Sequence, residues 1–193
     1  THSFLRWYLD AKNGSWGSIT GNWFIENLQH DLYMGNGQIM IPPGRYSFNS
    51  LMLFYNTPGK HALSCFFSAQ SGNFYDGRKL SLYAWPKVKI GASFDIGVTY
   101  YFDHVAIPSR SMHFTNHIAG FKGLMTLTTK TSVSAFVQYN TAINRVIVNT
   151  RFRYNPREGN DFYIVYDEGL NTNLTREIPS LPYSSGRNVL LKY

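Results

Sequence analysis

Residues 103–117 hold the side chains with the clearest catalytic potential. Asp103 and His104 are adjacent, and Ser109 and Ser111 follow in the same segment. A carboxylate, an imidazole and a serine hydroxyl are the three groups of a hydrolase triad. However, the sequence contains no Gly-x-Ser-x-Gly motif of the kind that presents a nucleophilic serine. We therefore favour polar loop residues over catalysis and predict that the protein is not an enzyme, with a hydrolase as the open alternative.

A second possibility for the same segment is a metal site at His113 and His117. A four-residue spacing places two histidines on one face of a helix, but this segment is predicted to be loop and strand. No His-Glu-x-x-His motif is present. The single cysteine, Cys65, lies in a strand-like run and has no zinc-type spacing. We predict no metal, no cofactor and no internal disulfide.

Charged residues gather in two strand-like segments, 144–155 and 161–168. Successive side chains of a strand point to opposite faces. If Phe152 and Phe162 face lipid, the side chains that face the other way, toward the lumen, are those of Arg151, Arg153, Asp161, Tyr163 and Asp167. We expect Arg153 to lie near Asp161 across the turn, as a cross-strand ion pair. The predicted charge network comprises Arg145, Arg151, Arg153, Asp161 and Asp167.

This predicted network has two interpretations. It could bind an anionic or sugar ligand, or it could satisfy polar groups inside a narrow or plugged barrel. We favour the structural role, and the ligand remains unknown. Either role requires the arginines to face away from lipid, because an arginine at the bilayer midplane costs roughly 2–4 kcal/mol.

The elements that must position these residues are long strands with one apolar face. Apolar and polar residues alternate over the whole of 88–100, which predicts a single strand. This is longer than the usual soluble strand of about 5–6 residues and sufficient to cross a bilayer. We expect about 11–12 strands and almost no helix. The other predicted strands are 4–12, 18–26, 45–55, 61–71, 74–84, 117–128, 131–140, 144–155, 161–168 and 187–193, while 27–41 is ambiguous.

The predicted connections differ in length. Turn residues mark short ones at 13–14, 57–59, 85–86, 129–130 and 155–160, and longer loops are predicted at 103–116 and 169–186. Short turns at one end and long loops at the other are typical of an antiparallel up-and-down transmembrane β-barrel. The sequence therefore predicts an all-β fold that is such a barrel or its C-terminal portion.

Composition favours the same class. Charged residues make up 15% of the 193 residues and aromatic residues 17%, whereas an average soluble domain has roughly 25% charged residues. Mean hydropathy is nevertheless only −0.25, as expected where apolar and polar residues alternate. The net charge of +7 is spread along the chain rather than gathered in a dense run, so we predict no nucleic-acid binding. Four tryptophans, with many tyrosines, suit belts at the two membrane interfaces.

The last third of the chain resembles the C-terminal barrel of a family of uncharacterised Gram-negative outer-membrane proteins. The resemblance is carried by 134–140 (SAFVQYN), by 149–169 (NTRFRYNPREGNDFYIVYDEG) and by the C-terminal strand ending at Tyr193. The segments 41–46 (IPPGRY) and 72–77 (GNFYDG) are also similar. In that family a carbohydrate-binding-family-nine-like sandwich usually precedes the barrel.

The resemblance implies that residues 1–193 are a portion of an outer-membrane barrel, with further strands and the sandwich domain upstream of Thr1. It implies a location in the cell outer membrane, with the lipid bilayer, lipopolysaccharide and other outer-membrane proteins as partners. The predicted function is that of a scaffold, anchor or accessory subunit, with a link to glycan binding or uptake. A soluble carbohydrate-binding β-sandwich is a further alternative.

Overall fold

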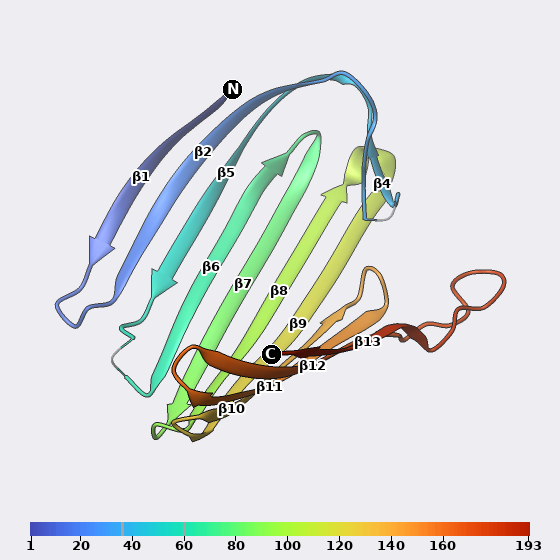
Figure 1. Ribbon diagram of the computed structural model, residues 1–193. Coiled ribbons are helices and arrows are strands. Elements are labelled where there is room, and N and C mark those ends of the chain that lie inside the picture. The colour runs from blue at the N-terminus through green and yellow to red at the C-terminus, as the bar shows by residue number, and fades with distance from the viewer. Residues whose placement is uncertain (36, 60) are drawn as a thin grey trace. The chain divides into compact units, whose positions relative to one another are not determined.

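The computed structural model describes residues 1–35, 37–59 and 61–193, and in these residues the protein is all-β (Figure 1). The one helical segment among them is a short 3-10 turn, η1 (Pro108–Arg110). The predicted antiparallel all-β class with almost no helix is therefore confirmed.

Eleven strands form one antiparallel sheet in the order β1-β2-β5-β6-β7-β8-β9-β10-β11-β12-β13, and a separate pair, β3-β4, forms a small hairpin. The large sheet is open, with β1 and β13 as its two edges. Its strands are β1 (His2–Asp10), β2 (Trp16–Leu28), β5 (Gly44–Asn56), β6 (Leu63–Phe74), β7 (Gly77–Ile90), β8 (Phe94–Ile107), β9 (Met112–Thr128), β10 (Thr131–Asn140), β11 (Arg145–Arg157), β12 (Asn160–Asn171) and β13 (Ser184–Lys192). The small hairpin consists of β3 (Leu32–Met34) and β4 (Ile39–Ile41).

The strands are long. The strands β2 and β5 each have 13 residues, β7 and β8 have 14, and β9 has 17. A tilted strand needs about 9–11 residues to cross a bilayer, and most of the strands reach that length.

The prediction of a single strand over 88–100 is wrong. β7 ends at Ile90, a turn occupies 91–93, and β8 begins at Phe94. Gly91 has a φ of 60°, in the left-handed region that glycine adopts without steric cost. The alternation of residue types continues through this turn, so periodicity alone could not reveal it.

Other predicted boundaries also change. The predicted turn at 85–86 is wrong because β7 runs through Pro86, which forgoes one ladder hydrogen bond. The predicted loop at 103–116 is mostly strand, since β8 reaches Ile107 and β9 begins at Met112. The ambiguous segment 27–41 contains the β3-β4 hairpin. The long connection after β12 is present, between Asn171 and Ser184.

The chain divides into two compact units, which are described separately below. The first unit consists of Thr1–Trp85 and Tyr100–His117, and the second of Pro86–Thr99 and Ile118–Tyr193. In both units polar and apolar residues separate onto opposite faces of the strands, and this separation positions the candidate site.

The first unit contains a small hydrophobic core around the β3-β4 hairpin. Ile39 and Ile41 from β4 are fully buried and pack with Val105 and Ile107 from the end of β8. Side chains packed against this cluster include Phe74, Tyr75, Met112 and Phe114. The connection between β2 and β5 thus folds back onto neighbouring strands of its own unit instead of extending into solvent (Figure 1).

Candidate functional site

One face of β1, β2, β5 and β6 is apolar and exposed. Residues directly opposite each other in antiparallel strands share a face, and the register places Trp7 beside Ile19, Leu53 and Ala69. Trp7 is 55% exposed and Leu51 50% exposed. This first apolar face comprises Leu5, Trp7, Leu9, Ile19, Trp23, Ile25, Leu51, Leu53, Tyr55, Phe67 and Ala69.

The opposite face of the same strands, the first polar face, buries polar side chains. Ser18 is 3% and Thr20 is 1% exposed, although both are polar. Arg6 donates from Nε to Oγ1 of Thr20 at 2.8 Å, and Gln70 donates from Nε2 to Oγ of Ser50 at 3.0 Å. β2 therefore buries polar side chains on this face, while the four strands expose apolar side chains on the other, which is the reverse of a soluble sheet.

Aromatic rings form a row across the first polar face. His2 stacks on Phe24 with ring centroids 4.4 Å apart, and Phe24 stacks on Phe48 at 5.1 Å. Phe48 then contacts Phe74 at 5.9 Å and Tyr75 at 5.0 Å. The row runs from β1 through β2 and β5 to β6, and it borders the core of the β3-β4 hairpin.

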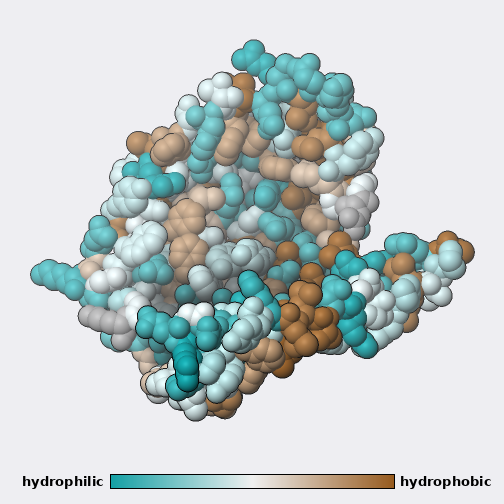
Figure 2. Space-filling model, in the orientation of Figure 1, coloured by the Kyte–Doolittle hydropathy of each residue, from teal (hydrophilic) through white to brown (hydrophobic). Residues whose placement is uncertain are grey.

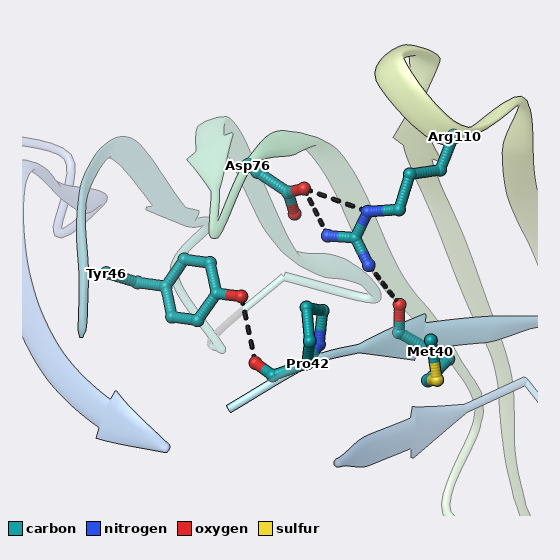
Figure 3. Close-up of polar contacts among 5 residues, drawn as sticks. All are labelled: Met40, Pro42, Tyr46, Asp76 and Arg110. Carbon is teal, nitrogen blue, oxygen red and sulfur yellow. Dashed lines mark hydrogen bonds and ion pairs between the residues drawn. The ribbon is translucent and has the colours of Figure 1, made fainter. Parts of the chain in front are cut away.

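Polar contacts anchor the β3-β4 hairpin to this face (Figure 3). Arg110 forms an ion pair with Asp76, with Nε donating to Oδ2 at 3.1 Å, and its Nη1 donates to the backbone carbonyl of Met40. Tyr46 donates from its hydroxyl to the carbonyl of Pro42 at 2.9 Å. One arginine after β8 therefore joins the β6-β7 turn to β4.

Tyr75 lies in the β6-β7 turn and connects it to β2. Its hydroxyl donates to Oε2 of Glu26 at 2.9 Å. Burial of the phenol, followed by this hydrogen bond to the carboxylate, raises the pKa of Tyr75 to about 12. Tyr75 therefore keeps its proton, and its hydrogen bond to Glu26, to a higher pH than an ordinary tyrosine does.

The second unit has an equivalent pair of faces on β9 to β12. Val133 of β10 lies opposite Met125 and Phe152, and Phe152 lies opposite Ile164. The second apolar face comprises Phe121, Met125, Val133, Val137, Val148, Phe152 and Ile164. Figure 2 shows strongly hydrophobic surface over β13, where Val189 and Leu191 are exposed.

By register and alternation, the five residues of the predicted charge network lie on the opposite face, the second polar face. Arg153 and Asp161 form the expected ion pair, Nε to Oδ1 at 2.8 Å, and Asn155 donates to the same oxygen at 2.9 Å. The guanidinium of Arg151 lies 5.9 Å from the centroid of the Tyr163 ring.

The other two predicted network residues lie farther along the same strands. Asp167 accepts a hydrogen bond from Nδ2 of Asn149, directly opposite it. The Nε atom of Arg145 is buried without a hydrogen-bond partner in the described ranges, beside Gly169. The five residues thus share a face, but they divide into local contacts along it.

Sequence reasoning missed a polar group on the second apolar face. Glu168 lies opposite Arg187 and accepts from its Nη2 at 2.6 Å, and the hydroxyl of Tyr166 also donates to Glu168. The pairing depends on the register of β13, whose start after a long connection cannot be read from residue types. Alternation could have placed Glu168 on the apolar side, but it could not have named its partner.

The residues considered for catalysis are not assembled into a triad. Asp103 and His104 are consecutive in β8 and point to opposite faces. Asp103 accepts from Oγ of Ser81 at 2.6 Å, whereas His104 contacts Oγ1 of Thr115 at 2.8 Å. His117 contacts the hydroxyl of Tyr100 at 2.8 Å.

No three His, Cys, Asp or Glu side chains in the described residues group closely enough to hold a metal ion. In the same part of the chain, no helix has the length and apolar character needed to span a membrane. Comparisons with protein-family models, curated proteins and solved structures gave no match to this chain.

Proposed function

We propose that this chain forms part of a β-barrel in a Gram-negative outer membrane. We propose that it serves there as a non-enzymatic scaffold, anchor or accessory subunit. The observation that carries the proposal is the first apolar face, which is exposed while polar side chains of β2 on the opposite face are buried. In a membrane the exposed apolar face contacts lipid and the polar face lines the lumen.

The first apolar face extends over β1, β2, β5 and β6. Exposed apolar patches on soluble monomers rarely exceed a few hundred Å², whereas this face continues across four neighbouring strands and carries exposed leucine, isoleucine, tryptophan and phenylalanine side chains. Covering such a face with lipid removes it from water, at roughly 25 cal/mol per Å² of apolar surface.

A membrane location also requires hydrogen-bond partners for the backbone of the two edge strands. Every backbone N–H and C=O in the hydrocarbon region needs a partner, so a spanning sheet must close. The edge strands β1 and β13 therefore each need a further strand partner in the membrane. In this proposal the lipid bilayer and lipopolysaccharide are the immediate partners, and other outer-membrane proteins are the partners of an accessory subunit.

Two single-tryptophan proteins test the proposal. One retains Trp7, on the first apolar face. The other retains Trp85, which alternation places on the polar side together with Tyr83, whose ring stacks on Tyr101 at 4.3 Å. After folding into vesicles with brominated lipid chains, we expect strong quenching of Trp7 fluorescence and weak quenching of Trp85.

Two results would contradict the membrane assignment. One is equal and weak quenching of both tryptophans. The other is a natively folded protein that stays monodisperse in buffer without detergent, which would favour the soluble carbohydrate-binding sandwich.

A further inference from the structure

A cavity opens on the first polar face beside the aromatic row. Its volume is about 220 Å³, below the roughly 300–1,000 Å³ of sites for drug-sized ligands. It is therefore of a size for one ring of a ligand. β2, β5, β6 and β7 all contribute residues to its wall, so the folded sheet is needed to form it.

Aromatic rings supply the apolar part of the wall. Phe24, Phe48, Phe74 and Tyr75 line the cavity, and the contacts between Phe48 and each of the other three hold the rings in a fixed arrangement. Packed rings of this kind lose little conformational entropy when a ligand binds. They offer an apolar surface to the C–H groups of a flat, non-aromatic ring.

Polar side chains supply the rest of the wall. Gln70 uses one N–H for Ser50, and among the described residues no hydrogen bond to its amide oxygen is found, so this oxygen can accept one from a ligand. The ammonium of Lys79 lies 5.4 Å from the centroid of the Phe74 ring, and no salt bridge to Lys79 is found within the described ranges. Glu26, across the cavity, carries the opposite charge and accepts from Tyr75.

These features together define the class of ligand. The ring faces of a sugar carry C–H groups and its edge carries hydroxyls that both donate and accept, which matches rings beside an amide, an ammonium and a carboxylate. One positive and one negative side chain favour a ligand without net charge. We propose that this cavity binds one ring of a neutral saccharide. This inference rests on the proposed function for one point, that the cavity faces the lumen of a barrel. It adds a saccharide ligand to the proposed scaffold or accessory role.

Calorimetric titration of the folded protein with neutral disaccharides tests the inference. Maltose, cellobiose, lactose and N,N′-diacetylchitobiose are the probes, and the detergent is an amine oxide because glucoside and maltoside detergents carry sugars themselves. We expect saturable binding of at least one probe. We expect Lys79→Met and Gln70→Leu each to weaken it about tenfold, because each removes a hydrogen bond worth about 1.4 kcal/mol.

Lys89→Met is the matched control, because Lys89 lies near the other end of the same strand and does not line the cavity. We expect this variant to bind like the unaltered protein. The inference is overturned if no probe binds at millimolar concentration, or if all three variants bind equally. Retention of heat-modifiable migration in gels reports the barrel fold separately, so loss of binding in a folded protein counts only against the ligand.

Discussion

Different interactions stabilise the polar faces of the two units. In the first unit, the β3-β4 hairpin folds onto the strands and creates a core in which Ile39, Ile41, Val105 and Ile107 are buried. In the second unit, the described residues contribute no buried hydrophobic side chain, and ion pairs and hydrogen bonds connect neighbouring strands across the polar face. Apolar packing therefore secures the first polar face, whereas polar contacts organise the second.

The difference shows which parts of such a sheet depend on side-chain packing. A buried core fails when a large side chain is truncated, because the cavity left behind adds to the lost burial. Exposed polar contacts are individually weak, because solvent screens them. Substitutions in the two units test this contrast.

Truncation at the hairpin core should have the largest effect. Ile41 is fully buried, and Ile41→Ala should lower the free energy of unfolding by about 2–5 kcal/mol. Denaturant unfolding in detergent micelles measures this change. Ile147→Ala in the second unit, where the side chain is 40% exposed, should cost far less, and equal losses would contradict the contrast between the units.

An arginine introduced on the apolar face of a strand should have the next largest effect on stability. Ala69 and Ser68 are consecutive near the middle of β6, on the apolar and polar faces respectively. Ala69→Arg should destabilise the membrane-inserted protein by about 2–4 kcal/mol, whereas Ser68→Arg should cost much less. Folding into vesicles at graded urea concentrations measures both, and a larger cost for Ser68→Arg would reverse the assignment of the faces.

Loss of the hairpin anchor should have a moderate effect. Arg110→Gln removes the ion pair with Asp76 and weakens the bond to the carbonyl of Met40. We expect a loss of about 1.5 kcal/mol, since both partners are partly buried. Protease cleavage within the β3-β4 hairpin should also accelerate. A double variant carrying Asp76→Asn and Arg110→Gln should lose no more free energy of unfolding than Asp76→Asn alone if the two side chains stabilise the protein as one ion pair. A larger loss in the double variant would show that they act separately.

The ion pair of the second polar face should contribute least to stability. Arg153 is exposed and Asp161 is half-buried, so solvent screening reduces their attraction. Asp161→Asn should leave the unfolding midpoint nearly unchanged in moderate salt. A large loss would show that this face is as tightly organised as the hairpin core.

A pH titration sharpens the comparison at the edge of the hairpin core. The pKa of Tyr75 is raised to about 12, so the folded state favours its neutral form. The stabilisation from this group is complete below about pH 10 and is lost as the pH rises through about 12. Because the pKa of Tyr83 is also raised to about 12 by burial, the tyrosinate absorbance that appears near pH 12 should decrease by one group in Tyr75→Phe and not vanish. An unchanged titration in that variant would contradict the assignment.

Much of the fold could be predicted from residue types. Alternation correctly predicted an antiparallel all-β chain and, in β11 and β12, the face on which Arg151, Arg153 and Asp161 lie, because side-chain direction in a strand has a period of two. The ion pair between Arg153 and Asp161 follows from the same rule once the short turn between the strands is recognised.

Other features could not be predicted because they depend on contacts distant in sequence. The turn after Ile90 interrupts a pattern that continues unbroken in residue type. The aromatic row needs β1, β2, β5 and β6 side by side, and its members are separated by long stretches of chain. No local pattern indicates which rings meet.

The residue types of each strand are enough to give it one apolar and one polar face, since that property belongs to the strand alone. The fold of the whole chain is needed to bring the β3-β4 hairpin onto the polar face, to place Arg110 where it anchors the hairpin, and to pair Glu168 with Arg187. Each of these contacts joins segments that strand register and the path of the loops bring together. The alternation of residue types specifies neither the register of a particular strand pair nor the path of a loop.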